Sequence, residues 1–201
     1  TLKRVNIIIV HNIQDLNTLK NFGLVKNIFL LPLGVNIYQS NETRKQNLQK
    51  KYKLESKKLI ATYGFLLPHK GILEIIEAFK IVKKQDKNLH LLLLNSIYPS
   101  PISEDYKKEC LKKVEELNLQ NDISFINDYL DYEDSFELLN LSDLLVLMYK
   151  NTQESASASI RELLTTKKPV LCSKEKIFND VSQIVHFIDE YTVPNIAKNL
   201  E

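Results

Sequence analysis

Two glutamates, Glu154 and Glu162, enclose a run of alternating serines and alanines. The run comes just before an apolar spacing at Ile160, Leu163 and Leu164, where a helix is expected to begin. Free N–H groups and the positive end of the helix dipole at such a start favour an anionic ligand. Small side chains would let that ligand approach the backbone. The stretch ESASASIRE is therefore the first candidate site.

The separation of the two glutamates limits what the pair could do. On a helix, eight residues correspond to about 12 Å of rise and roughly 80° of rotation, so the carboxylates would share a side without being adjacent. Paired acid and base carboxylates usually stand about 5 to 9.5 Å apart. The spacing therefore favours a role in which the two glutamates bind the two ends of one elongated polar ligand. The alternative is an exposed helix with two solvated glutamates.

A second candidate is the loop YGFLLPHKG, which begins at Tyr63 and ends at Gly71. Gly64 frees the backbone to turn, and Lys70 stands where the next helix begins. A lysine beside a helix start suits a phosphate group, although a solvated lysine is the alternative. The chain contains neither G-x-G-x-x-G nor G-x-x-x-x-G-K-[ST], which argues against a dehydrogenase or a P-loop NTPase.

The elements that position these residues follow from alternating apolar runs and helical segments. Strands that are apolar throughout are covered on both faces, so the pattern predicts an α/β fold with a doubly wound, Rossmann-like parallel sheet. Ligands of such sheets bind outside the carboxyl ends of the strands. The loops at that edge are expected after Tyr63, Leu94, Ile126, Met148 and Cys172, and Glu154 follows the fourth of these strands.

Composition excludes several classes of protein. The chain has 201 residues and a net charge of +2, which favours neither a nucleic-acid partner nor an acidic tail. Two cysteines, Cys110 and Cys172, lie in apolar patterns and are expected to be buried thiols rather than zinc ligands, in a cytoplasmic setting. No apolar run approaches the length needed to span a bilayer, and the start of the chain lacks the layout of a signal peptide. Any membrane contact is expected to be peripheral, on the inner face.

The first part of the chain, before this regular alternation, contains two short apolar runs and then a polar stretch. Val5–Val10 and Ile28–Leu33 read as strands, with a short helix between them that ends at Gly23. The polar stretch Asn41–Lys58 is interpreted as a linker and a solvated helix, because its apolar face is too thin to anchor on an anionic membrane.

Taken in order, these pieces resemble the retaining glycosyltransferases of family 4, of group 1 type, whose GT-B fold has two facing Rossmann-like domains. The resemblance covers almost the whole chain, and six segments in the family's order carry it. They are IIIVHN (7–12), IFLLPLGVN (28–36), HKGILEIIEAF (69–79), LNLSDLLVLMY (139–149), ESASASIRE (154–162) and PVLCS (169–173).

The resemblance implies that residues 1–40 are the end of an N-terminal acceptor domain with the interdomain linker. Residues 41–201 would be the nucleotide-sugar-binding domain, one half of a GT-B fold. The parent enzyme would move a hexose from a nucleotide sugar to a saccharide or lipid-linked acceptor with retention, in polysaccharide or glycoconjugate biosynthesis. The fragment is expected to bind donor but to catalyse poorly. No cofactor or metal is expected, with the nucleotide sugar as substrate.

The resemblance also implies roles for single residues. Lys70 would stabilise the diphosphate leaving group, Glu154 would hold the hydroxyls of the donor sugar, and Glu162 those of the ribose, with Lys70 and Glu154 counted as catalytic. The donor-binding set is expected to comprise Gly64, Lys70, Asn127, Glu154, Ser155, Ala156, Ser157 and Glu162.

One position departs from the family pattern. Phe65 stands where the family often has an arginine, so phosphate stabilisation would rest on Lys70 and helix dipoles, with His69 or Arg161 as further candidates. Two other classes remain open at this point. One is a non-catalytic, flavodoxin-like module that binds a nucleotide or a protein partner, and the other is a GT-B phosphorylase or epimerase.

Overall fold

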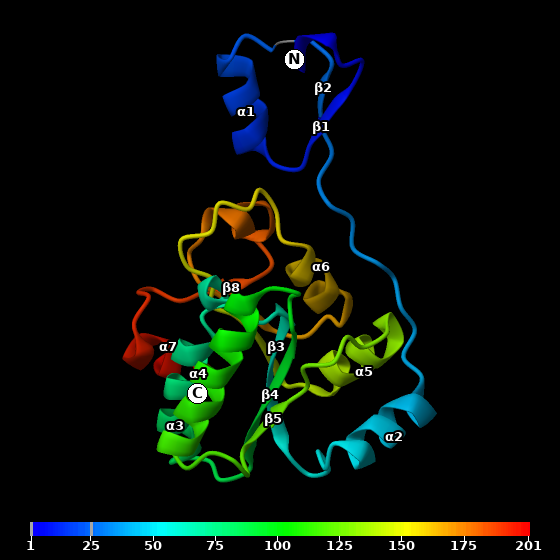
Figure 1. The fold of residues 1–201 in the computed structure, drawn as a ribbon. Helices are drawn as coiled ribbons and strands as arrows, with labels where there is room; N and C mark the ends of the chain where they lie inside the picture. The colour runs from blue at the N-terminus through cyan, green and yellow to red at the C-terminus, as the bar shows by residue number, and fades with distance from the viewer. Residues whose placement is uncertain (1, 25) are drawn as a thin grey trace.

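The chain forms a small N-terminal unit and a larger C-terminal unit, joined by an extended segment (Figure 1). The computed structural model describes residues 2–24 and 26–201. In the N-terminal unit, a short 3₁₀ turn (Leu2–Arg4) precedes two parallel strands, β1 (Ile8–Val10) and β2 (Ile28–Leu30), with helix α1 (Ile13–Asn21) between them. These are the two strands and the short helix that the sequence predicts, although both strands are shorter than their apolar runs.

The C-terminal unit is built on a six-stranded sheet in the order β5-β4-β3-β6-β7-β8, with every neighbouring pair parallel. The order steps outward from β3 in both directions, which is the doubly wound arrangement. The predicted fold class is confirmed. The strands are β3 (Lys58–Phe65), β4 (Leu89–Ser96), β5 (Ile123–Phe125), β6 (Leu144–Leu147), β7 (Val170–Cys172) and β8 (His186–Phe187).

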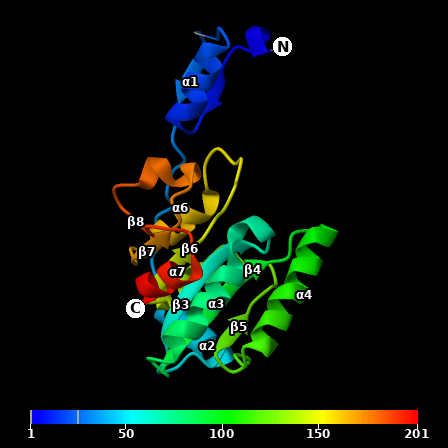
Figure 2. The same cartoon turned by 90° about the vertical axis from the view of Figure 1, so that its left-hand side faces the viewer.

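Helices cover both faces of this sheet (Figure 2). Within residues 2–24 and 26–201, no helix is both long and apolar enough to cross a membrane. One face carries α3 (Ile72–Lys83), α4 (Pro101–Glu116) and α7 (Val193–Leu200). The other carries α2 (Glu42–Lys51), α5 (Tyr132–Leu141), α6 (Ala158–Thr165) and the 3₁₀ segment η3 (Lys176–Val181).

Strand β4 shows why the apolar runs form this architecture. Leu91 and Leu93 are buried in the core under α3 and α4, whereas Leu92 and Leu94 are buried in the core on the opposite face. Successive side chains of a strand point to opposite faces, so an uninterrupted leucine run fills two cores at once. The carboxyl end of β4 is thereby fixed at the edge where the loops gather.

Helix α2 is better anchored than its composition predicts. Leu48 on the helix and Leu54 just beyond it are both buried in the core under α5. Arg44 on the exposed side lies 3.3 Å from Asp134 of α5. The predicted helix is present, and Leu48 is its only buried residue, but burial of Leu48 and Leu54 fixes it on α5, which its polar composition did not predict.

The end of the extended segment is tied to α5. The buried carboxylate of Glu137 accepts hydrogen bonds from Ser40 Oγ at 2.7 Å and from the Asn41 amide at 2.5 Å. The Tyr38 ring packs on Phe136, with ring centroids 4.2 Å apart. By contrast, Ile37 is 98% exposed. The segment is thus held to the C-terminal unit from Tyr38 onward.

Both cysteines are buried free thiols, as the sequence predicts. Burial raises the pKa of the Cys110 thiol to about 12 and also raises the pKa of Cys172. Both side chains therefore act as small apolar core residues.

Candidate donor site

Lys70 is positioned by a tight turn between β3 and α3. The 3₁₀ turn η2 (Pro68–Lys70) ends at Gly71, whose φ of +70° lies in the left-handed region that glycine adopts at no steric cost. A Cβ at Gly71 would lie 2.0 Å from the carbonyl oxygen of Met148. Glycine therefore lets the turn pack against the end of β6, which brings Lys70 to the segment that follows β6.

The Lys70 ammonium group lies between an aromatic ring and a carboxylate. Lys70 is 7% exposed. Its Nζ lies 3.1 Å from Glu154 Oε2 and 3.8 Å from the centre of the Tyr149 ring. The ring stabilises the cation by a cation–π contact. The buried charge is therefore held at the carboxyl edge of the sheet by two groups of the segment between β6 and α6.

His69 lies beside this pair. Its Nε2 is 3.5 Å from Glu154 Oε1. Burial, and then the nearby Lys70 charge, lower the pKa of His69. The imidazole is therefore neutral at pH 7, and the positive charge of this turn resides on Lys70.

The two glutamates do not share a helix. Helix α6 begins at Ala158, where the Ser157 hydroxyl caps it by accepting a hydrogen bond from the Ile160 amide at 3.3 Å. Glu154 lies in the loop before α6, and Glu162 lies on it. The helical rise and rotation predicted for the pair are therefore wrong. Each serine of the run could serve as a cap, and the structure uses the last one before Ala158.

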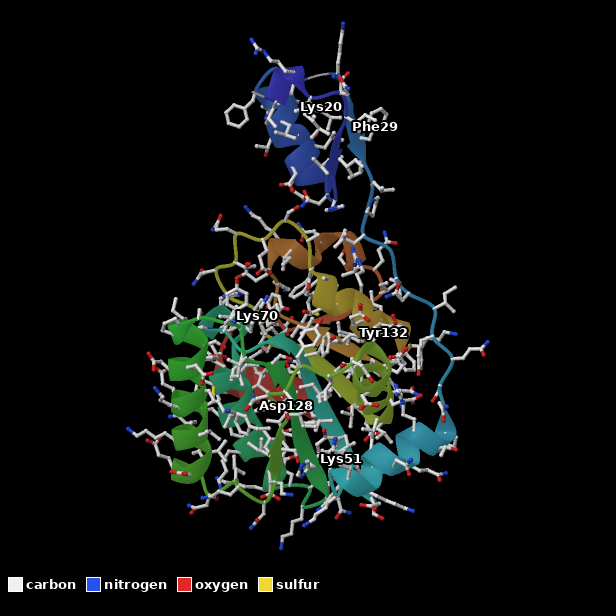
Figure 3. All side chains as sticks on the ribbon, turned by 45° about the vertical axis from the view of Figure 1, so that its right-hand side comes forward. Lys20, Phe29, Lys51, Lys70, Asp128 and Tyr132 are labelled. Carbon is white, nitrogen blue, oxygen red and sulfur yellow. The ribbon has the colours of Figure 1, made fainter. Side chains whose placement is uncertain are left out.

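A cavity of about 230 Å³ lies between the carboxyl ends of β3, β4 and β5 and the first turns of α6. Its lining includes Tyr63, Asp128, Tyr129, Ser135, Ser159 and Glu162. Figure 3 labels Asp128 of this lining near the middle of the C-terminal unit, with Lys70 and Tyr132 nearer the N-terminal unit and Lys51 toward the opposite end. The cavity thus occupies the edge at which doubly wound sheets bind ligands.

Glu162 is the half-buried carboxylate of this cavity. Burial raises the pKa of Glu162 from its usual value. Burial and the Glu162 charge also raise the pKa of the Tyr63 phenol, which therefore stays protonated. A carboxylate in partly dry surroundings gains most from ligand groups that donate hydrogen bonds, such as vicinal hydroxyls.

Gly64 brings β3 close to α6. Its φ is +122°, and a Cβ there would lie 2.8 Å from Ser159 Oγ. A larger residue would therefore push Ser159 into the cavity or strain the strand end. Gly64 and Ser159 together form one wall of the cavity.

A sequence model of the family described as glycosyl transferases group 1 matches residues 43–194. The chain belongs to the group 1 glycosyltransferases. No curated protein sequence matches it.

Solved structures of low sequence identity share the fold of this group 1 chain. The C-terminal domain of the group 1 glycosyltransferase LpcC from Francisella tularensis has a TM-score of 0.68 and 22% identity, over 84% of this chain and 85% of that one. HepE from Anabaena, solved with UDP and glucose, has a TM-score of 0.80 and 16% identity, over 98% of this chain and 53% of its own. A glycosyltransferase from Rickettsia africae has a TM-score of 0.77 and 20% identity, over 97% and 52%. The chain thus spans about half the length of HepE and of the Rickettsia protein.

The structure places four of the eight predicted donor-binding residues of this glycosyltransferase at the carboxyl edge of the sheet, in two groups. Gly64 and Glu162 line the cavity, whereas Lys70 contacts Glu154 outside that lining. Asn127 does not line it, because its side-chain amide donates to the Asn95 carbonyl at 2.9 Å. The three residues that follow it, 128–130, line the cavity instead.

The small residues before α6 also differ from their predicted use. The free amides of the helix start belong to Ala158 and Ser159, because the helix begins after Ser157. Ala156 lies half-buried in the loop, and the hydroxyl and carbonyl of Ser155 contact the N-terminal unit. The prediction that Ser155, Ala156 and Ser157 present the amides of the helix start was therefore wrong for Ser155 and Ala156, whereas Ser157 lies at the start as the N-cap.

Arg161 cannot share the phosphate charge with Lys70. Its guanidinium is 7% exposed and forms an ion pair with Asp180 of η3. This candidate for phosphate stabilisation was wrong. Successive residues of a helix point about 100° apart, so Arg161 faces η3 while Glu162 faces the cavity. No sequence motif indicates the cavity residues Ser135, Ser159 and Asp128. Only their positions beside predicted strand or helix ends could have indicated them.

Proposed function

We propose that this group 1 glycosyltransferase binds a nucleotide sugar at the edge formed by Lys70, Glu154 and Glu162, as the donor half of a retaining enzyme. The observation that carries the proposal is the buried Lys70 ammonium group on the Tyr149 ring, whose hydroxyl lies 4.0 Å from where a Cβ of Gly64 would stand. Gly64 in turn lines the cavity that holds the half-buried carboxylate of Glu162. The Lys70 ammonium group can bind a diphosphate, and the Glu162 carboxylate can accept hydrogen bonds from hydroxyls. A nucleotide sugar carries both kinds of group.

The proposed roles follow from this geometry. Lys70 contacts the diphosphate, and Glu162 accepts hydrogen bonds from the ribose hydroxyls in the cavity. Glu154, in the exposed loop, moves from the ammonium group to the hydroxyls of the sugar when the diphosphate takes its place. The structures of HepE with UDP and glucose support this class of ligand.

The proposed reaction needs no nucleophilic carboxylate. The bond between the anomeric carbon and the phosphate oxygen breaks, the acceptor oxygen bonds to the same face, and its proton passes to the leaving phosphate. Lys70 and the amides of the α6 start stabilise the charge that develops on that phosphate, so no metal is proposed. The acceptor is proposed to be a saccharide or a lipid-linked saccharide, in polysaccharide or glycoconjugate biosynthesis. Transfer by residues 1–201 alone is expected to be slow.

Calorimetric titration with UDP-, GDP- and ADP-sugars tests donor binding. We expect one nucleotide to bind, and its Kd to rise when Glu154 or Glu162 is replaced. Absence of binding by the wild-type chain to all three nucleotides would refute the proposal.

Glu162→Gln is expected to weaken nucleotide-sugar binding by about tenfold and to raise the melting temperature at pH 7. The folded-state pKa of Glu162 is raised by burial, so this carboxyl contributes stability that is complete below its unfolded pKa and is lost as pH rises through the folded pKa. Glutamine does not ionise and avoids that loss. Thermal melts at pH 4 and pH 7 measure the effect, with exposed Glu109→Gln as the matched control. A lower melting temperature of Glu162→Gln at pH 7 would contradict the argument.

A further inference from the structure

The loop that carries Glu154 contacts the N-terminal unit. The Asn12 side-chain amide donates to the Ser155 carbonyl at 2.6 Å and lies 2.9 Å from Ser155 Oγ. The Ser155 hydroxyl in turn donates to the Asp15 carboxylate. Figure 1 shows the start of α1 next to the segment that precedes α6. The residue after Glu154 is thus held by the first turn of α1.

Asn12 and Asp15 are fixed relative to each other before they meet Ser155. Asn12 is the N-cap of α1, and its Oδ1 accepts a hydrogen bond from the Asp15 amide at 2.7 Å. Its Nδ2 also lies 3.2 Å from Asp15 Oδ2. The pair therefore presents one donor and one acceptor side by side, which complement the carbonyl and hydroxyl of a serine.

Glu154 and Ser155 are held from opposite sides. The Glu154 carboxylate contacts Lys70 and His69 of the C-terminal unit, whereas Ser155 contacts α1 of the N-terminal unit. Both residues are exposed and lie in a loop without regular structure. Ordering such a loop when a ligand binds would cost conformational entropy. The contacts at both residues order the loop before the ligand arrives, which lowers that cost.

We propose that Asn12 and Asp15 are positioning residues that hold the Glu154 loop in place for the sugar of the donor. This inference rests on the proposed function. When a diphosphate occupies Lys70, Glu154 loses its ionic partner, and the contacts of Ser155 keep its backbone within reach of the sugar hydroxyls. Recognition of the sugar, unlike that of the nucleotide, then requires the N-terminal unit to be in contact with the loop.

Two substitutions test this with the whole chain. Asn12→Asp keeps the capping oxygen but replaces the amide donor by an acceptor that faces the Ser155 carbonyl. Asp15→Ala removes the acceptor for the Ser155 hydroxyl. Gln14→Ala, at an exposed position of the same helix, is the matched control, and Asp15→Asn, which keeps an acceptor, should restore binding.

The measurement compares the nucleotide sugar that binds in the titration above with its nucleoside diphosphate, starting with UDP-glucose and UDP. Both variants are expected to weaken nucleotide-sugar binding about fivefold and to leave diphosphate binding unchanged. Hydrogen exchange of residues 150–157 should become faster in Asn12→Asp and not in Gln14→Ala.

Three results would overturn the inference: unchanged sugar binding in the variants, an equal loss for sugar nucleotide and diphosphate, or unchanged exchange in the loop. Failure of the wild-type chain to bind any nucleotide would instead overturn the proposed function, and with it this role. A merely structural role of Asn12 and Asp15 predicts a lower melting temperature and an equal loss for both ligands.

Discussion

Asp180→Ala is expected to lower the free energy of unfolding by about 3–5 kcal/mol, because it leaves the Arg161 guanidinium buried without a counter-charge. The side chains of Arg161 and Asp180 are 7% and 17% exposed. Among the described residues, Arg161 Nε has no hydrogen-bond partner, so the Asp180 contact is the main compensation for burying this charge. Urea denaturation followed by circular dichroism measures the loss.

Two further variants separate charge from packing. Asp180→Asn keeps an acceptor for the guanidinium and should lose less stability than Asp180→Ala. The double variant Arg161→Met, Asp180→Leu removes both charges together and should recover most of the loss, since replacing both partners by apolar groups can be nearly neutral. A double variant as unstable as Asp180→Ala would refute the assignment of the loss to an unpaired buried charge.

Most of the fold could be predicted because its strands are buried on both faces. Runs such as Leu91–Leu94 contain no polar residue and fill the cores on both faces of the sheet, so the parallel sheet follows from them. The stretch Ile184–Ile188 also has the length and the apolar content of a strand, but it is less regular in the structure. Its strand, β8, covers only His186–Phe187, and Ile184 is 64% exposed, because an edge strand needs to fill only part of its apolar run. The 3₁₀ segment η3 has no periodic pattern that could predict it.

The site was predicted in part. Lys70 and Gly64 could be placed from strand–loop–helix order alone, because β3, η2 and α3 follow one another in the chain, whereas their contacts with Glu154 and Ser159 could not. The contact of Arg161 with Asp180 and that of Ser155 with Asn12 join residues far apart in the chain, and no local pattern encodes them. The start of α6 was misplaced because serine at any of three positions satisfies the same capping preference.

Lys70→Ala is expected to weaken binding of the nucleoside diphosphate by about 10- to 100-fold, which is the range for hydrogen bonds to a charged group. Lys70 is 7% exposed, so water screens its charge little, and its Nζ already contacts an anionic group, the Glu154 carboxylate. A diphosphate in place of the carboxylate would form the same ionic contact with Lys70 Nζ, and it has more oxygen acceptors for the ammonium group. Calorimetric titration measures the change, and Lys108→Ala on α4, where the side chain is 75% exposed, is the control.

The stability of the Lys70 variant decides between a ligand role and a structural one. Removing Lys70 leaves Glu154 free, and the Glu154 side chain is 47% exposed, so water can solvate the carboxylate and the fold should lose little. The Tyr149 ring loses its cation–π partner, at a cost of about 0.5–2 kcal/mol. Strong loss of diphosphate binding with a small shift in melting temperature therefore indicates that Lys70 binds ligand. Unchanged binding would mean that Lys70 serves only to hold Glu154 and Tyr149, and the donor site would have to lie elsewhere.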